Sequence, residues 1–145
     1  IMKRCPKCGR EVYPSISTAI LVLVRKEDSL LLVHARNFKG TFNSLVAGFL
    51  ETGETLEECV AREVKEETGL DIAGCRYLFS IPNLYPYSGF EVHTVDMFFE
   101  CLTESFDGAK AEDDAAEIII LPATQLNSDD FGLQSIKKAV DRYIK

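Results

Sequence analysis

The most constraining feature of this sequence is the stretch at residues 48–70, which reads GFLETGETLEECVAREVKEETGL. Apolar residues recur in it at the spacing of one face of an α-helix, which predicts a helix from about residue 55 to residue 68. A stripe of this kind normally faces the core of a domain. It consists of Leu56, Val60 and Val64, with Cys59 at its edge.

Glutamates also lie on or beside this stripe, which is an unusual place for charged residues. Carboxylates crowded within one helical turn repel one another and lose hydration when partly buried, unless a cation compensates them. A solvated acidic face is the alternative, but it is disfavoured because these glutamates lie on the same side of the helix as the apolar stripe. We expect Mg²⁺ or Mn²⁺, which prefer oxygen ligands and keep waters that substrate phosphates can replace. The inward residues are Glu63, Glu66 and Glu67, and the opposite face carries Glu57, Glu58, Ala61, Arg62 and Lys65.

The same stretch carries a known motif. Gly48 is followed after five residues by Glu54, and Glu54 is followed after seven residues by REVKEETGL at positions 62–70. These residues match every fixed position of the box of the Nudix hydrolase family, which the chain therefore resembles. The resemblance implies an α/β fold, namely a Nudix-type α/β/α sandwich with a mixed β-sheet. It also implies hydrolysis of a nucleoside diphosphate linked to another group, with Mg²⁺ or Mn²⁺ held by the helix.

The resemblance further implies a set of metal ligands. In the family, the carbonyl just before the box glycine binds the metal, and this position is Ala47 here. A further acidic ligand often precedes a late strand, and the favoured register places Asp114 there. A solvated acidic turn is the alternative at that position. The box itself supplies Glu63, Glu66 and Glu67.

Two more box residues are expected to support catalysis. Arg62 would fix the box loop by hydrogen bonding its carboxylates, and Glu54 would orient Arg62 or complete the outer shell of the metal. The general base is one of the three box glutamates or a residue outside the box. The sequence leaves this choice open.

The rest of the chain fits one compact unit. Its 145 residues, 46% of them hydrophobic, are enough to bury a core, and this length favours a single domain. A net charge of −7 without any basic block argues against a nucleic-acid or membrane surface. No apolar run approaches the roughly 20 residues of a membrane span, and no signal-peptide pattern precedes the fold. We therefore expect a cytoplasmic protein.

Residues 1–14 are expected to form a short segment ahead of a Nudix domain at residues 15–145. Cys5 and Cys8 lie in CPKCG, which is typical of half a zinc ribbon, but a structural Zn²⁺ site needs four sulfur or nitrogen ligands. No second CxxC follows. The remaining ligands would come from a dimer partner, from sequence ahead of residue 1, or from His34 or His93.

Apolar runs elsewhere predict the rest of the fold. Strands are expected at residues 16–24, 30–35, 45–49, 75–80, 92–102 and 118–121, with loops at residues 37–41 and 105–111. An amphipathic helix is expected at residues 131–144. Helices on both faces of a mixed sheet would bury these runs. Cys59, Cys75 and Cys101 are expected to be core thiols.

The order of motifs resembles one branch of the family, the NADH pyrophosphatases. That branch follows its zinc ribbon with a YPRIS-like segment and carries SQPWPFPxS after the box. This chain reads YPSIS at residues 13–17 and SIPNLYPYS at residues 80–88. It departs from the branch at Asn83 and Leu84, where the branch has tryptophan and proline.

Residues 81–90 are interpreted as a substrate loop that prolines stiffen. Its aromatic rings offer flat surfaces for a base to stack on, and Asn83 can read hydrogen-bonding edges. A hydrophobic loop that packs on a neighbour or a dimer partner is the alternative. The substrate-binding candidates are Tyr13, Phe49, Ile81, Pro82, Asn83, Tyr85, Tyr87 and Ser88.

The sequence as a whole predicts a pyrophosphohydrolase that converts NADH or NAD⁺ to AMP and nicotinamide mononucleotide. An ADP-ribose, sugar-nucleotide or nucleoside-triphosphate pyrophosphatase is the alternative among enzymes. A non-catalytic nucleotide-binding module is the alternative from another class, and a zinc-dependent interaction knuckle at CPKCG is a third. The partner is expected to be a small-molecule nucleotide. The family resemblance adds a homodimer, without specifying its interface.

Overall fold

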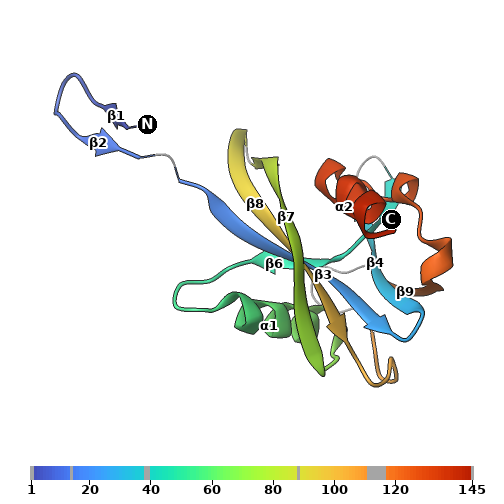
Figure 1. Cartoon of the computed structure of the whole chain (residues 1–145). Helices are drawn as coiled ribbons and strands as arrows, with labels where there is room; N and C mark the ends of the chain where they lie inside the picture. The colour runs from blue at the N-terminus through green and yellow to red at the C-terminus, as the bar shows by residue number, and fades with distance from the viewer. Residues whose placement is uncertain (1, 14, 38–39, 88, 111–116, 145) are drawn as a thin grey trace.

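The computed structural model describes residues 2–13, 15–37, 40–87, 89–110 and 117–144 and arranges most of them around one mixed β-sheet (Figure 1). Two helices pack on this sheet, α1 (Leu56–Thr68) and α2 (Gln134–Ile144). The 3₁₀ turns η1 (Ala123–Gln125) and η2 (Ser128–Asp130) precede α2. The strands of the sheet are β3 (Ser17–Lys26), β4 (Ser29–Asn37), β5 (Gly40–Ser44), β6 (Val46–Phe49), β7 (Gly74–Tyr87), β8 (Phe90–Leu102) and β9 (Glu117–Pro122).

The sheet splits between strands β3 and β4. Its main path runs β5-β4-β3-β8-β7, with β3 and β8 parallel and the other pairs antiparallel. Strand β3 pairs with β4 only from Val24 to Lys26, and it pairs with β6 from Ala19 to Val22. Strand β9 pairs with β4 instead. The end of β6 is thereby placed beside α1.

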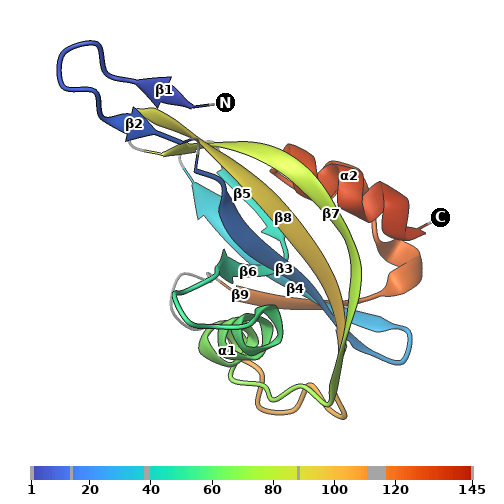
Figure 2. The same cartoon turned by 60° about the vertical axis from the view of Figure 1, so that its left-hand side comes forward.

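Successive side chains of β3 point to opposite faces of the sheet and contribute to two separate hydrophobic cores. Ile20 and Val22 pack in the core that contains Val60 of α1, whereas Leu21 packs in the core that contains Ile136 of α2. The two helices accordingly lie on opposite sides of the sheet (Figure 2). The predicted α/β/α sandwich with a mixed sheet is therefore confirmed.

Helix α1 begins and ends where its sequence dictates. Thr55 is the N-cap: its hydroxyl accepts a hydrogen bond from the Glu58 N–H, and the Glu58 carboxylate accepts one from the Thr55 N–H, each at 3.1 Å. Gly69 follows the helix with φ of +78°, a left-handed conformation that favours glycine. These caps fix the ends of the helix that carries the box glutamates.

Removing the N-cap is expected to weaken the fold without touching the glutamates that face the pocket. Thr55→Ala deletes the hydroxyl acceptor and should lower the free energy of unfolding by about 1 kcal/mol. Urea denaturation followed by circular dichroism measures this change. Thr55→Ser, which keeps the hydroxyl, is the matched control, and an equal loss in both variants would contradict the capping role.

Two predicted boundaries near the sheet edge are wrong. Residues 37–41 were expected as a loop, yet β4 reaches Asn37 and β5 starts at Gly40, and these strands pair in register. Helix α2 was expected from residue 131 but begins at Gln134. Phe131 instead has an extended backbone and forms a bridge with Asn43, which commits it to strand pairing.

The stretch interpreted as a substrate loop is also mostly strand. Strand β7 continues through Tyr87 and pairs with β8 as one long hairpin, with an irregularity between Tyr77 and Phe79. Pro82 and Pro86 are compatible with this arrangement because β7 is the outermost strand of the sheet path, and edge strands tolerate proline. The aromatic residues of this stretch are therefore presented by a hairpin arm.

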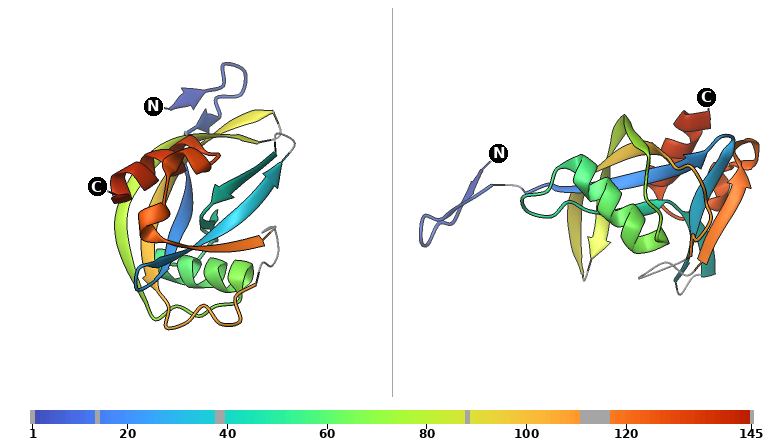
Figure 3. Two further views of the ribbon diagram at one scale, coloured as in Figure 1. Left: turned by 90° about the vertical axis from the view of Figure 1, so that its right-hand side faces the viewer. Right: turned by 90° about the horizontal axis from the view of Figure 1, so that it is seen from below.

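The N-terminal segment forms a small sheet of its own. Strands β1 (Lys3–Arg4) and β2 (Glu11–Val12) pair as a hairpin that projects from the body of the molecule (Figure 3). Among the described residues, no helix has the length and apolar character needed to cross a membrane.

Candidate active site

Arg62 organises the box through hydrogen bonds to three of its carboxylates, those of Glu54, Glu63 and Glu66, and to the backbone. Its Nε and Nη2 donate to the two oxygens of Glu54, at 2.6 and 3.0 Å, so this pair is bidentate. Nη2 also donates to the Phe49 carbonyl at 3.2 Å, and Nη1 donates to Glu63 Oε1 at 2.7 Å. The sequence placed Arg62 on the outer face of α1, but only 22% of its side chain is exposed because it folds back over the loop.

The pKa values of Glu54 and Glu63 are shifted in opposite directions. The hydrogen bond from Arg62 holds the pKa of Glu54 at about 2, below its usual 4.5. Burial raises the pKa of Glu63, and the hydrogen bond from Arg62 opposes that rise. Glu54 therefore stays ionised and anchors Arg62, whereas the pKa of Glu63 lies above its usual value.

Gly48 makes room for Glu63. A Cβ atom at position 48 would lie less than 3.0 Å from Cγ, Cδ and Oε1 of Glu63, so only glycine allows this carboxyl to cross over β6. Glu67 is held by the same strand, since its Oε2 accepts a hydrogen bond from the Ala47 N–H at 3.2 Å. The end of β6 thus positions both carboxyls.

Glu66 departs from the predicted inward cluster. Its side chain is 46% exposed, and its Oε2 accepts a hydrogen bond from Arg62 Nη1 at 3.2 Å. Within the described ranges, no three His, Cys, Asp or Glu side chains are arranged so that they would hold a metal ion. Arg62 instead compensates the charge of Glu63 and Glu66.

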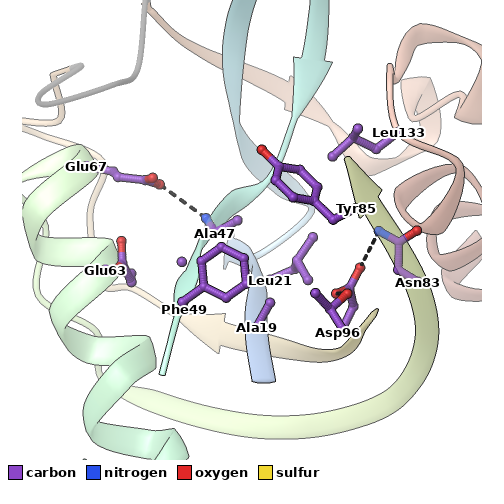
Figure 4. Close-up of a pocket in the computed structure, with 12 residues that line it drawn as sticks. Ala19, Leu21, Ala47, Phe49, Glu63, Glu67, Asn83, Tyr85, Asp96 and Leu133 are labelled. Carbon is purple, nitrogen blue, oxygen red and sulfur yellow. Dashed lines mark hydrogen bonds between the residues drawn. The ribbon is translucent and has the colours of Figure 1, made fainter. Parts of the chain in front are cut away.

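A pocket of about 430 Å³ lies beside these carboxyls (Figure 4). Glu63 and Glu67 line one side of it, and Phe49 and Tyr85 line another, with ring centroids 6.4 Å apart in an edge-to-face arrangement. Polar side chains of β7 and β8 complete the wall, namely Asn83, Thr94 and Asp96. Carboxylates beside an aromatic surface are suited to a molecule with both a phosphate group and a flat ring.

A family model of the NUDIX domain matches residues 15–143. The chain belongs to the Nudix family. The Nudix box therefore accounts for the glycine, arginine and glutamates described above.

Curated relatives share part of their length with this Nudix chain. A protein from Photobacterium profundum named NAD-capped RNA hydrolase NudC is 48% identical over 82 residues, which are 57% of this chain and 31% of that protein. A protein of the same name from Salmonella agona is 39% identical over 125 residues, 86% of this chain and 42% of that protein. The chain thus matches less than half the length of these relatives.

Solved structures support the Nudix fold. A NUDIX hydrolase from Nitrosomonas europaea superposes with a TM-score of 0.68 at 19% identity, covering 99% of this chain and 84% of the other. The dihydroneopterin triphosphate pyrophosphohydrolase of E. coli gives 0.71 at 18% identity, covering 88% and 94%. At these identities the likeness establishes the fold alone.

The structure brings only some of the predicted substrate residues to the pocket. Phe49, Asn83 and Tyr85 line it. Tyr13 follows β2 in the projecting segment and is 65% exposed, and Ile81 packs against the core beneath α2. Pro82 is exposed on β7. The Tyr87 side chain, Ser88 and the metal-ligand candidate Asp114 lie outside the described residues.

The cysteines divide differently from the prediction. Cys59 and Cys101 are buried as expected, but Cys75 is exposed on the edge strand β7. Cys5 and Cys8 face each other across the hairpin turn, where hydrogen bonds from the Cys8 and Lys7 backbone lower the pKa of the Cys5 thiol. Zinc binding at this pair stays a prediction, since two thiols supply half of a tetrahedral site.

Sequence reasoning missed several residues that line the pocket. Thr94 and Asp96 alternate with apolar residues along β8, so they share the face that Phe98 buries beneath α2. The alternating pattern of β8 already placed the charged residue Asp96 on the inward face of the strand, and a charged residue there could have indicated a functional site. The apolar lining from Ala19, Leu21 and Leu133 had no such signal.

Gly48→Ala tests the crossing of Glu63 over β6. The new methyl group displaces a flexible side chain and no backbone, so the protein should fold normally while hydrolysis slows by about 10²-fold. Steady-state kinetics and a thermal melt measure the two effects. Gly74→Ala, where the methyl group meets open space, is the control, and unchanged activity in Gly48→Ala would contradict the packing argument.

Proposed function

We propose that this chain hydrolyses the pyrophosphate bond of a nucleoside diphosphate linked to another group, with NADH or NAD⁺ as the leading substrate and AMP and nicotinamide mononucleotide as products. The observation that carries the proposal is the pocket itself. It combines the box carboxyls Glu63 and Glu67 with the aromatic pair Phe49 and Tyr85 in one cavity. A substrate that carries both phosphates and a ring would contact the carboxyls and the aromatic pair at the same time.

The donor chemistry of the site fits Mg²⁺ or Mn²⁺. Glu63, Glu66 and Glu67 offer hard oxygen atoms, and the glycine at position 48 leaves the space that Glu63 occupies. Glu63 and Glu67, which line the pocket, would hold the metal, with Glu66, the Ala47 carbonyl and Asp114 as further candidates. When bound, such an ion neutralises phosphate charge and activates water for hydrolysis.

The chain's own groups supply orientation and a proton acceptor. Arg62, anchored by Glu54 and the Phe49 carbonyl, holds the loop between β6 and α1 in place. The general base is assigned to Glu63 or Glu67, because both line the pocket and Glu66 does not. The base would take its proton on a carboxylate oxygen that faces the pocket.

The relatives' names favour a nicotinamide dinucleotide as the substrate. The proteins named NAD-capped RNA hydrolase cover up to 86% of this chain in sequence. NAD-capped RNA is the second candidate, because its cap presents the same pyrophosphate bond. The net charge of −7 favours the free dinucleotide, since the sequence has no basic block to neutralise an RNA backbone.

A hydrolysis panel tests the proposal. Purified protein with Mg²⁺ or Mn²⁺ is incubated with NADH, NAD⁺, an NAD-capped RNA oligonucleotide, ADP-ribose, a sugar nucleotide and a nucleoside triphosphate, and products are separated by chromatography. We expect NADH or NAD⁺ to give the highest kcat/KM. Turnover of another nucleotide with none of the nicotinamide compounds cleaved would reassign the substrate. Binding without any turnover would favour the non-catalytic module.

A further inference from the structure

Asp96 is a buried carboxyl group in the pocket wall, and its partners do not neutralise it. It is only 4% exposed. Its Oδ1 accepts a hydrogen bond from Thr94 Oγ1 at 2.9 Å, and its Oδ2 accepts one from Asn83 Nδ2 at 3.2 Å. Across the described part of the chain, no lysine or arginine forms an ion pair with it. Such burial is costly for folding, which suggests that the group is retained for binding.

The surrounding hydrogen bonds lock this carboxyl in one orientation. Asn83 Oδ1 accepts a hydrogen bond from the Leu84 N–H at 2.9 Å, which fixes the amide so that its NH₂ faces Asp96. The same NH₂ lies 3.4 Å from Ser135 Oγ on α2. Each Asp96 oxygen accepts one hydrogen bond from the protein and retains capacity for another.

The pocket around Asp96 suits a flat ring rather than a metal ion. Beside the carboxyl, the wall is formed by Ala19, Leu21 and Leu133, and the rings of Phe49 and Tyr85 lie close by (Figure 4). A hard cation needs several further oxygen ligands, which an apolar wall does not provide. An aromatic ring with an N–H donor on its edge satisfies both the wall and the carboxyl.

We propose that Asp96, positioned by Asn83 and Thr94, determines specificity by accepting a hydrogen bond from an amino or amide NH₂ group on the substrate's ring. The inference rests on the proposed function, because the ring is one end of the nucleotide that the box hydrolyses. This chemistry is shared by the carboxamide of nicotinamide, the 6-amino group of adenine and the 2-amino group of guanine. A ring without the donor leaves the carboxyl desolvated and unpaired, so the site rejects it.

Binding of mononucleotides tests the proposal without requiring hydrolysis. Calorimetry measures Kd for three pairs that differ at the NH₂ group: nicotinamide against nicotinate mononucleotide, AMP against purine riboside 5′-monophosphate, and GMP against IMP. Wild-type protein should prefer the NH₂ compound by at least about tenfold in one pair, and that pair identifies the ring. Asp96→Asn should bring the ratio within about threefold of unity or reverse it, because its own NH₂ then faces the ligand.

Two further variants make the outcome decisive. Asp141→Asn removes an exposed carboxyl from α2 and should leave every ratio unchanged. Thr94→Val removes one hydrogen bond to Asp96 and should reduce the same ratio partly; it also serves if Asp96→Asn does not fold. No preference in any pair, or a preference that Asp96→Asn and Thr94→Val both retain, would overturn the assignment of Asp96. Such a result would leave the hydrolysis panel unaffected, whereas failure of the panel with intact binding ratios would overturn the proposed reaction alone.

Discussion

Glu67→Gln is expected to lower kcat on the leading substrate by about 10³-fold while the protein remains folded. Glutamine has nearly the same shape and keeps an oxygen that can accept the hydrogen bond from the Ala47 N–H. It has no charge with which to bind a cation and is a poor proton acceptor. Steady-state kinetics with Mg²⁺ and Mn²⁺, together with a thermal melt, separate the loss of chemistry from a loss of fold.

Glu57→Gln is the matched control for this experiment. Glu57 lies on the same helix, is exposed and is remote from the pocket lining, so its replacement should leave kcat unchanged. Full activity in Glu67→Gln would contradict a catalytic or metal-binding role for that residue. If wild-type protein and Glu67→Gln bind nucleotide equally well without metal and neither turns it over, the binding-module alternative is supported.

Arg62→Met is expected to produce the largest loss of stability, lowering Tm at pH 7 by roughly 10 °C. The change leaves Glu54 and Glu63 poorly solvated and without their cation, since their side chains are only 12% and 13% exposed. Arg76→Met is the control because Arg76 is 69% exposed and, within the part of the chain that the structure describes, forms an ion pair only with Glu100. Equal melting of the two variants would contradict the organising role of Arg62.

The Arg62 effect should also depend on pH in a defined direction. The folded pKa of Glu54 is depressed, so the stability that this carboxyl provides is present above pH 4.5 and is lost as the pH falls toward 2. The difference in Tm between wild type and Arg62→Met should therefore shrink as the pH falls from 5 to 2, and a constant difference would contradict an electrostatic cause.

The box helix was the most predictable element because several local signals agree there. The apolar stripe, the capping residues and Gly69 specify one helix, and α1 spans Leu56–Thr68 as expected within one residue. The core on each face of the sheet was also predictable, because the spacing of apolar residues along the helices and strands shows which faces they bury. Helices on both faces of a mixed sheet were expected to bury the apolar runs, and the structure has this arrangement.

Strand pairing and side-chain reach explain what the sequence did not reveal. Asn37, Gly40 and Thr41 were read as part of a loop, and residues 81–87 as another, because of their glycine or prolines. Each nevertheless pairs with the adjoining strand of a hairpin, β4 with β5 and β7 with β8. Arg62 was assigned to the outer face by its helical phase. Its long side chain nevertheless reaches Glu54 and the Phe49 carbonyl, contacts that depend on the loop fold.

The edge strand β7 has a consequence for the behaviour of the whole molecule in concentrated solution. Alternate residues of a strand direct their N–H groups to the same edge. On β7, Pro82 and Pro86 have no N–H, and the N–H of Leu84 between them donates to Asn83 Oδ1. From residue 82 to residue 86, this edge therefore offers no free donor to an incoming strand, so the prolines that accompany the pocket also protect the protein against edge-to-edge aggregation.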